Sequence, residues 1–207
     1  MPPTPLRVAI VVFDGFSELD TFVTFGLLNR LSAAGWKAEL VAPSARVTSM
    51  NGVTVDTPQP LEFANEAAAV VFSGGLYNRA IAENSAVIDR LSLDPLRQMI
   101  GGQCSGTLLL ARLGLLADVP ASTDVASKPW MVQAGVRVAD DTPFHARGPV
   151  ATAGGPLAAH YLATWLMWRA AGLEQATHAL NQAAPVGQRD DWTERLLSVV
   201  RPFVPDR

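Results

Sequence analysis

The chain has 207 residues, 49% of them hydrophobic, which is enough for a substantial buried core, and its formal net charge is −3 at pH 7. The charges are scattered and form no basic patch, so we expect no nucleic-acid partner. No apolar run reaches the roughly 18 residues of a membrane span, and the first residues lack a secretory-signal pattern, so we expect no membrane association and a cytoplasmic location.

In the first half of the chain, short apolar runs alternate with helical patterns. A helix is predicted to end at Gly35, and the pair Asn51-Gly52 predicts a small ribbon at the edge of the sheet. The predicted strands are 6–13, 37–42 and 67–72, and the predicted helices are 21–34 and 86–97.

The second half continues the alternation. Its predicted strands are 98–104, 136–139 and 149–153, and its predicted helices are 105–116, 156–171, 173–182 and 191–201. Strands that are separated by helices require crossover connections, so the sheet should be mostly parallel and covered on both faces. We expect one domain over 1–207, built as a three-layer α/β/α sandwich.

Ligands of such folds gather at the carboxyl ends of the strands. Three segments fall there: FDGFSELD after the first strand, Ser73-Gly74-Gly75 after the strand at 67–72, and the turn at Cys104. They are remote in sequence, but we expect them to converge in space.

Cys104, the only cysteine, stands in GGQCSGTLLL, where a strand turns into a helix. Such an elbow exposes the residue beside the unpaired amides and positive dipole of the helix N-terminus, which favours a thiolate. Composition alone favours the alternative, a thiol buried as a small hydrophobic group. The glycines around Cys104 favour the elbow.

A reactive thiol needs a partner that sets its protonation, and the nearby candidates are carboxyl groups. Asp20 can supply or accept a proton if burial raises its pKa. The alternative is that Asp20 caps the helix starting at Thr21. Glu18 is better explained as a solvated loop residue.

Four segments together resemble the ThiJ/PfpI superfamily, whose domains are glutamine amidotransferase-like. They are VAIVVFDGFSELDTFVTFGLL, VVFSGG, GGQCSGTLLLARLGLL and VATAGGPLAAHYLATWL, within residues 6–185. The resemblance is strongest to the branch containing isonitrile hydratase and the sensor domains of AraC-type regulators. It implies a flavodoxin-like fold with a cysteine nucleophile elbow.

The resemblance assigns roles by position. It makes Cys104 the nucleophile and Asp20 its acidic partner, with Ser105 as the hydroxyl residue that follows the cysteine. It also assigns Gly74 and Gly75 to the turn whose amides form part of an anion-stabilising pocket.

Departures from the family pattern narrow the chemistry. Many relatives carry histidine directly after the cysteine or in a Thr-Thr-His segment, where this chain has Ser105 and Ser122-Thr123-Asp124. No His-x-Glu follows, so neither a histidine-assisted protease nor an amidotransferase triad is expected. His145, His160 and His178 are expected in a loop, on a helix face and on a helix surface. Their spacing predicts no metal site, and no cofactor is expected.

A cysteine and a carboxylic acid without histidine suit addition to a small unsaturated electrophile. The resemblance therefore implies a small-molecule enzyme, an isonitrile hydratase (a lyase) that forms an N-substituted formamide. The alternatives are a non-catalytic ligand sensor and a glyoxalase or deglycase. Members are commonly homodimers, for which the apolar faces at 20–34 and 156–171 are candidate contacts.

Overall fold

The computed structural model describes residues 6–139 and 141–205, and its centre is a seven-stranded sheet. The strand order is β5-β2-β1-β6-β7-β9-β8, and every neighbouring pair is parallel except β9 and β8. The strands are β1 (Leu6–Val11), β2 (Trp36–Ala42), β5 (Gln59–Pro60), β6 (Ala69–Phe72), β7 (Met99–Gln103), β8 (Phe144–Arg147) and β9 (Val150–Ala153).

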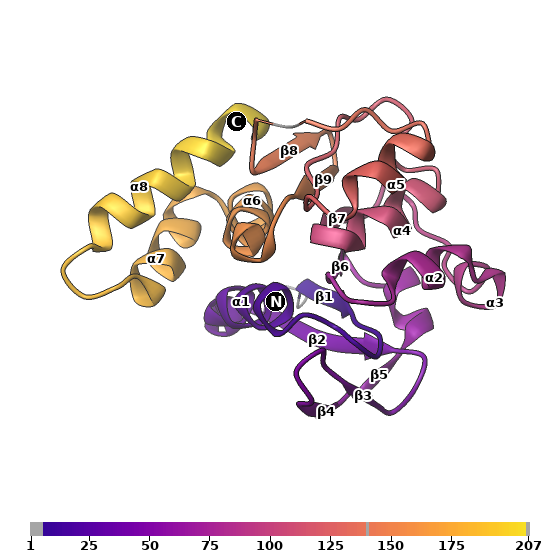
Figure 1. Ribbon diagram of the computed structural model, residues 1–207. Coiled ribbons are helices and arrows are strands. Elements are labelled where there is room, and N and C mark those ends of the chain that lie inside the picture. Colours follow the sequence, from indigo (N-terminus) through magenta and orange to yellow (C-terminus); the bar gives the residue numbers. More distant parts are fainter. Residues whose placement is uncertain (1–5, 140, 206–207) are drawn as a thin grey trace.

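Helices cover both faces of this sheet. The helices are α1 (Glu18–Leu28), α2 (Asn78–Glu83), α3 (Ser85–Ile88), α4 (Thr107–Arg112), α5 (Lys128–Gln133), α6 (Ala159–Ala171), α7 (Leu173–Ala183) and α8 (Arg189–Val200). Helices α1, α6, α7 and α8 lie on one side of the strands, and α2 to α5 lie on the other (Figure 1). The expected three-layer, mostly parallel sandwich is therefore confirmed. No helix in the described part of the chain is both long and apolar enough to cross a membrane.

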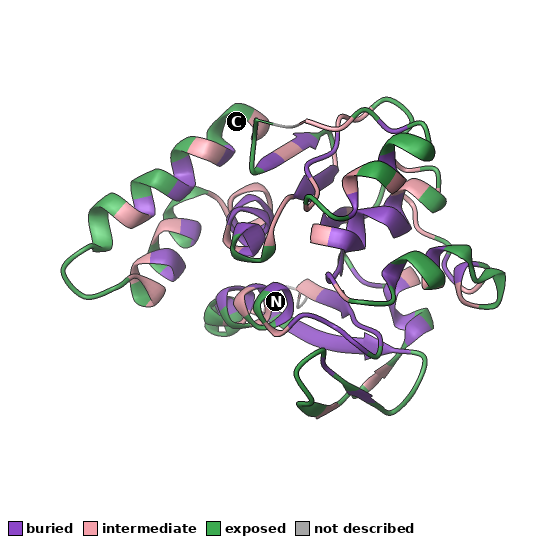
Figure 2. Ribbon diagram, in the orientation of Figure 1, coloured by how far each residue is buried: buried purple, intermediate pink, exposed green. Residues whose placement is uncertain are grey.

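Each face of the sheet has its own core, because successive side chains of a strand point to opposite faces. In β1, Val8 and Ile10 pack into the core that contains Trp165, whereas Ala9 and Val11 pack into the core on the opposite face. These four β1 side chains are fully buried, and the central strands β1, β6, β7 and β9 are mostly buried (Figure 2). Burial on both faces explains why residues 8–11 of β1 are all apolar.

The prediction of a single helix over 86–97 is wrong. The chain forms the short helices α2 and α3, and α3 ends at Ile88. Asp94 precedes Pro95, and a residue before proline is disfavoured in the α region. The Arg97 amide donates to the Asp94 carbonyl, which makes a turn in place of a last helical turn.

Three further differences involve short elements. The ribbon around Asn51-Gly52 forms as predicted from β3 (Arg46–Thr48) and β4 (Thr54–Asp56), but it is a two-stranded sheet of its own and is not hydrogen-bonded into the main sheet. The strand predicted at 136–139 is reduced to a bridge between Val138 and Ala121, and the edge strand is β8. Helix α5 was not predicted.

Candidate active site

The central strands β1, β6 and β7 are neighbours and run parallel, so the loops that leave their carboxyl ends meet. Gly74 shows how closely they meet. A Cβ added to Gly74 would lie 2.5 Å from Asp20 Oδ2 and 2.9 Å from Cys104 Cβ. The Asp20 carboxyl and Cys104 therefore approach one another beside a residue that has no side chain to separate them.

The backbone at Cys104 confirms the elbow. Its φ is +53°, and no other described residue except glycine has a positive φ. A side chain costs about 1–2 kcal/mol in this left-handed region, so the surrounding structure must hold it there. Thr107 Oγ1 donates to the Cys104 carbonyl at 2.7 Å and Thr123 Oγ1 donates to the same oxygen at 3.0 Å. These two hydroxyls fix the strained turn.

Asp20 is not a helix cap. Helix α1 begins at Glu18, and its cap is Ser17, whose hydroxyl accepts from the Asp20 amide at 3.4 Å. The Asp20 side chain is only 1% exposed, and neither carboxyl oxygen has a hydrogen-bond partner among the residues that the structure describes. Burial raises the pKa of Asp20, and the charge of Asp124 adds to the rise. The Ser17 and Gln103 side chains lower the pKa of Asp20 by less than burial raises it, although each outweighs the contribution of Asp124.

The expected thiolate at Cys104 is wrong for this arrangement. Burial is the main cause that raises the pKa of the thiol, and the charges of Asp20 and Asp124 raise it further. The Ser105 amide favours the anion but does not outweigh them. Helix α4 has only 6 residues, which is less than two turns, so its dipole does little to stabilise a thiolate. The resting site therefore holds a neutral thiol.

Ser105 links the elbow to the glycine turn. Its hydroxyl donates to the Gly75 carbonyl at 2.9 Å and accepts from the Gly75 amide at 2.9 Å and from Asn78 Nδ2 at 3.2 Å. The Gly75 amide is thus engaged in this conformation, and the Gly74 carbonyl accepts from the Ser17 amide at 2.8 Å. The hydroxyl holds the two loops together, and catalytic roles for Ser105 and the two glycines stay predictions.

A model of the DJ-1/PfpI family matches residues 6–168. The chain belongs to the DJ-1/PfpI family. This confirms the ThiJ/PfpI resemblance, and the strand order with the cysteine elbow confirms the flavodoxin-like fold. No curated protein matches the chain.

Three solved structures illustrate the family fold. Drosophila melanogaster DJ-1beta is similar at a TM-score of 0.75 with 22% identity, over 87% of this chain and 98% of that one. A ThiJ/PfpI family protein from Pseudomonas syringae gives 0.74 with 18% identity, over 95% and 90%. An AraC family transcriptional regulator from Pseudomonas putida gives 0.70 with 20% identity, over 87% and 100%.

The three histidines of this DJ-1/PfpI domain contact aromatic or amide side chains. His145 lies in β8, so its expected loop position is wrong, and its ring packs on Phe203. His160 lies on α6, where burial and then the charge of Arg195 lower its pKa to about 4. His178 pairs with Gln182 on the surface of α7.

Glu18 makes its side-chain hydrogen bonds away from the elbow. Its carboxylate accepts from the Ser49 hydroxyl and from Asn51, and the Ser49 bond is the main cause that lowers its pKa. Glu18 therefore anchors the β3–β4 ribbon to α1, and Asp20 is the acid of α1 that reaches Cys104.

Two further polar residues lie at this DJ-1/PfpI site, of which Gln103 was not singled out in the sequence. Gln103 is fully buried, its Nε2 donates to the Gly155 carbonyl at 2.8 Å, and its Oε1 has no partner among the described residues. Asp124 Oδ2 is likewise buried without a partner there. Gln103 stands directly before the cysteine, and Asp124 stands where many relatives carry histidine, so both positions carry a usable signal.

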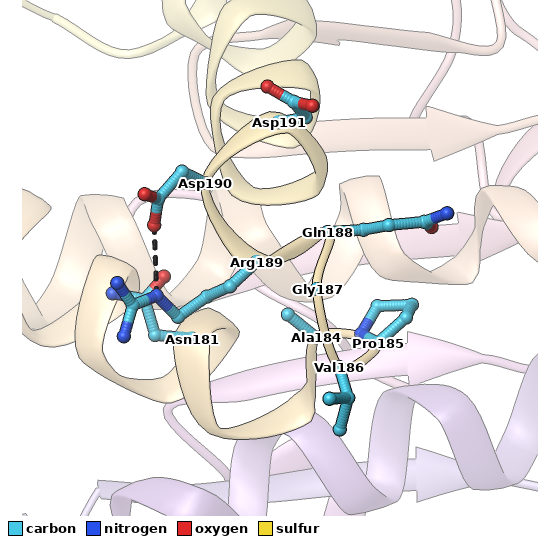
Figure 3. A pocket seen from close by; sticks show the side chains of 9 residues that line it. All are labelled: Asn181, Ala184, Pro185, Val186, Gly187, Gln188, Arg189, Asp190 and Asp191. Atoms are coloured by element: carbon cyan, nitrogen blue, oxygen red, sulfur yellow. Dashed lines mark hydrogen bonds and ion pairs between the residues drawn. The ribbon is translucent and has the colours of Figure 1, made fainter.

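A hollow of about 540 Å³ lies away from the elbow (Figure 3). It is lined by residues 184–191, which are the α7–α8 connection and the start of α8, together with Asn181, and its ion pair joins Arg189 to Asp190 at 2.9 Å. This connection lies at the left edge of Figure 1, whereas α4, which follows Cys104, lies on the right. The hollow shares no residue with the site at Cys104.

Asp20→Asn is expected to raise stability at neutral pH. Because the folded-state pKa of Asp20 is raised, the native form binds its proton more tightly than the unfolded chain does, so wild-type stability falls as pH rises above the ordinary carboxyl range of about 4. Asparagine does not titrate, so the variant should gain on the order of 1 kcal/mol at pH 7.5 and nothing below about pH 4. Thermal melts at both pH values measure the difference.

Glu18→Gln is the matched control for this measurement. The pKa of Glu18 is lowered, so removing its charge should reduce stability at neutral pH, the opposite sign. The melting temperature of Asp20→Asn is compared with that of wild type at the same pH. If the variant is less stable than wild type at pH 7.5 but not at pH 4, Asp20 is a stabilised anion.

Proposed function

We propose that this protein is a cysteine-dependent hydratase of small isonitriles, with Cys104 as nucleophile and Asp20 as proton donor. One observation carries the proposal: the Asp20 carboxyl and the Cys104 thiol meet beside Gly74, and burial raises the pKa of both groups. Burial thus favours the protonated form of each group, which is the form that this reaction requires.

The terminal carbon of an isonitrile is unusual because it forms two new bonds in the addition. The sulfur of Cys104 bonds to this carbon while a proton arrives at the same atom, and the carbon–nitrogen triple bond becomes a double bond. A buried neutral carboxylic acid is suited to deliver that proton. The product is a thioimidate, Cys–S–CH=N–R.

Water then completes the reaction. It adds to the thioimidate carbon, the carbon–sulfur bond breaks, and the nitrogen gains a proton, which yields R–NH–CHO and the free thiol. The Asp20 carboxylate, having given up its proton, can take one from the incoming water and so return to its starting state. The unpartnered Gln103 Oε1 offers an acceptor beside Asp20 for such a water.

Turnover of simple isonitriles tests this proposal. Purified protein should convert at least one of a panel of alkyl and aryl isonitriles to the corresponding formamide, detected by mass spectrometry, and should leave methylglyoxal unchanged. Absence of turnover over the whole panel would overturn the hydratase, and turnover of methylglyoxal alone would favour the glyoxalase or deglycase.

A non-catalytic ligand sensor is the second candidate. It is favoured by the similarity to the AraC family regulator and by the raised pKa of the Cys104 thiol. Saturable binding of an isonitrile without formamide release would support the sensor. A cytoplasmic homodimer belongs to the same proposal, and sedimentation of the purified chain tests the dimer. Its candidate contact face is α1, where Leu19 and Phe22 are exposed, because the apolar side chains of α6 are mostly buried within the fold.

A further inference from the structure

Asp124 is fixed in place by a turn at the start of α5. Its Oδ1 accepts from the Ser127 amide at 3.0 Å, and its backbone carbonyl accepts from the Lys128 amide at 3.1 Å. Its Oδ2 is buried and has no hydrogen-bond partner among the described residues. One oxygen of the carboxyl group therefore orients the side chain, and the other remains available.

The segment that carries Asp124 is hydrogen-bonded to the elbow. Thr123 Oγ1 donates to the Cys104 carbonyl at 3.0 Å and accepts from Thr107 Oγ1 at 2.9 Å. The Ser122 amide donates to Thr152 Oγ1 at 2.9 Å, which ties the same segment to β9. These bonds hold Asp124 beside the elbow, and Asp124 is one of the groups that raise the pKa of the Cys104 thiol.

Two other buried side chains near the elbow, Asp20 and Gln103, also have oxygens without a hydrogen-bond partner among the described residues. Both oxygens of Asp20, which is 1% exposed, and Oε1 of Gln103, which is 0% exposed, have no partner within the described part of the chain. Buried polar atoms are almost always paired, so a set of unpaired acceptors around a thiol indicates a site built for a ligand or for protons that move. Asp124 Oδ2 is one of this set.

We propose that Asp124 is a second catalytic carboxyl group, which receives the Cys104 proton as sulfur bonds to the substrate. This rests on the proposed function. Asp20 and Asp124 then divide between them the proton transfers at Cys104.

The protons balance over the cycle. In the addition, Asp124 takes the thiol proton and Asp20 gives its proton to the isonitrile carbon, which leaves Asp124 neutral and Asp20 ionised. In the hydrolysis, Asp20 recovers a proton from water as the hydroxyl adds to carbon. The carbon–sulfur bond then breaks, Asp124 returns its proton to sulfur, and the proton of the added hydroxyl moves to nitrogen. The sum is R–NC plus H₂O giving R–NH–CHO.

Asp124→Asn isolates this role. Asparagine keeps an oxygen that can accept from the Ser127 amide, so the turn survives, but it removes the charge and the proton-accepting oxygen beside the thiol. We expect Cys104 of the variant to be alkylated by iodoacetamide about threefold faster or more at pH 8, because the thiol loses a proton more readily. The turnover number for isonitrile hydration should fall by about a hundredfold, the low end of the usual contribution of general acid–base catalysis.

The exposed Asp118 supplies the matched control, since Asp118→Asn removes one carboxylate of the preceding loop and should change neither rate. An alkylation profile of Asp124→Asn from pH 6 to 9 that coincides with wild type would overturn the proposal whatever the substrate. Faster alkylation with unchanged turnover would also overturn it. If wild type hydrates no isonitrile, the proposed function fails, whereas faster alkylation of the variant would still show that the Asp124 carboxylate acts on the Cys104 thiol.

Discussion

Cys104→Ala is expected to lower the turnover number for isonitrile hydration by roughly a thousandfold or more, because no other group in the site can form the thioimidate. The only cysteine of the chain is at this position, so no second thiol can substitute for it. Formamide release by the variant and by wild type, measured under the same conditions, gives the ratio.

The same substitution should leave the fold intact. Alanine removes one sulfur atom from a half-buried position, and the clamp on the Cys104 carbonyl is made by the side chains of Thr107 and Thr123, which remain. We expect the melting temperature to stay within about 2 °C of wild type, since the change breaks no buried hydrogen-bond network. A folded Cys104→Ala protein that retained wild-type turnover would remove Cys104 from the mechanism.

Gly106→Ala is expected to have the largest effect on stability. A Cβ at this position would overlap the Phe72 carbonyl oxygen and would lie 2.8 Å from the Phe72 carbonyl carbon and from Ser73 O. These atoms belong to the backbone at the end of β6, which cannot move without breaking its pairing with β1 and β7. The cost should be about 3 kcal/mol, or a fall in melting temperature of roughly 6–12 °C for a chain of this size.

Gly26→Ala is the matched control for this prediction. It lies inside α1, its φ is not positive, and an added Cβ would meet nothing within 4 Å. Alanine is favoured over glycine in a helix by about 1 kcal/mol, so this variant should be as stable as wild type or more stable. Equal melting temperatures for the two variants would show that the elbow tolerates a side chain at Gly106.

The long, buried elements were predictable because their patterns are strong. The apolar run at the start of the chain became β1, and Gly35, with a φ of +86°, ends the segment after α1 as expected. The elbow was also predictable, since glycines at 102 and 106 permit a contact that any side chain would block. These features depend on local sequence, so one sequence suffices to find them.

Features that depend on tertiary contacts were missed. Strand β8 has only four residues and pairs at the edge with β9, so its pattern is too short to distinguish from a loop. The site shows the same limit: Asp20 could be proposed, but its burial, which sets its pKa, is a property of the folded chain. The contact of Asp124 with Cys104 likewise requires the connection that crosses from α4 to α5.

The most direct test of the account is to find the covalent intermediate on Cys104. Wild-type protein mixed with excess isonitrile, quenched at short times and digested, should give a Cys104 peptide heavier by the mass of one isonitrile molecule. This species should appear before the formamide and decay as substrate is exhausted. Formamide release with no added mass on Cys104 at any time, or with the mass on another residue, would contradict the account.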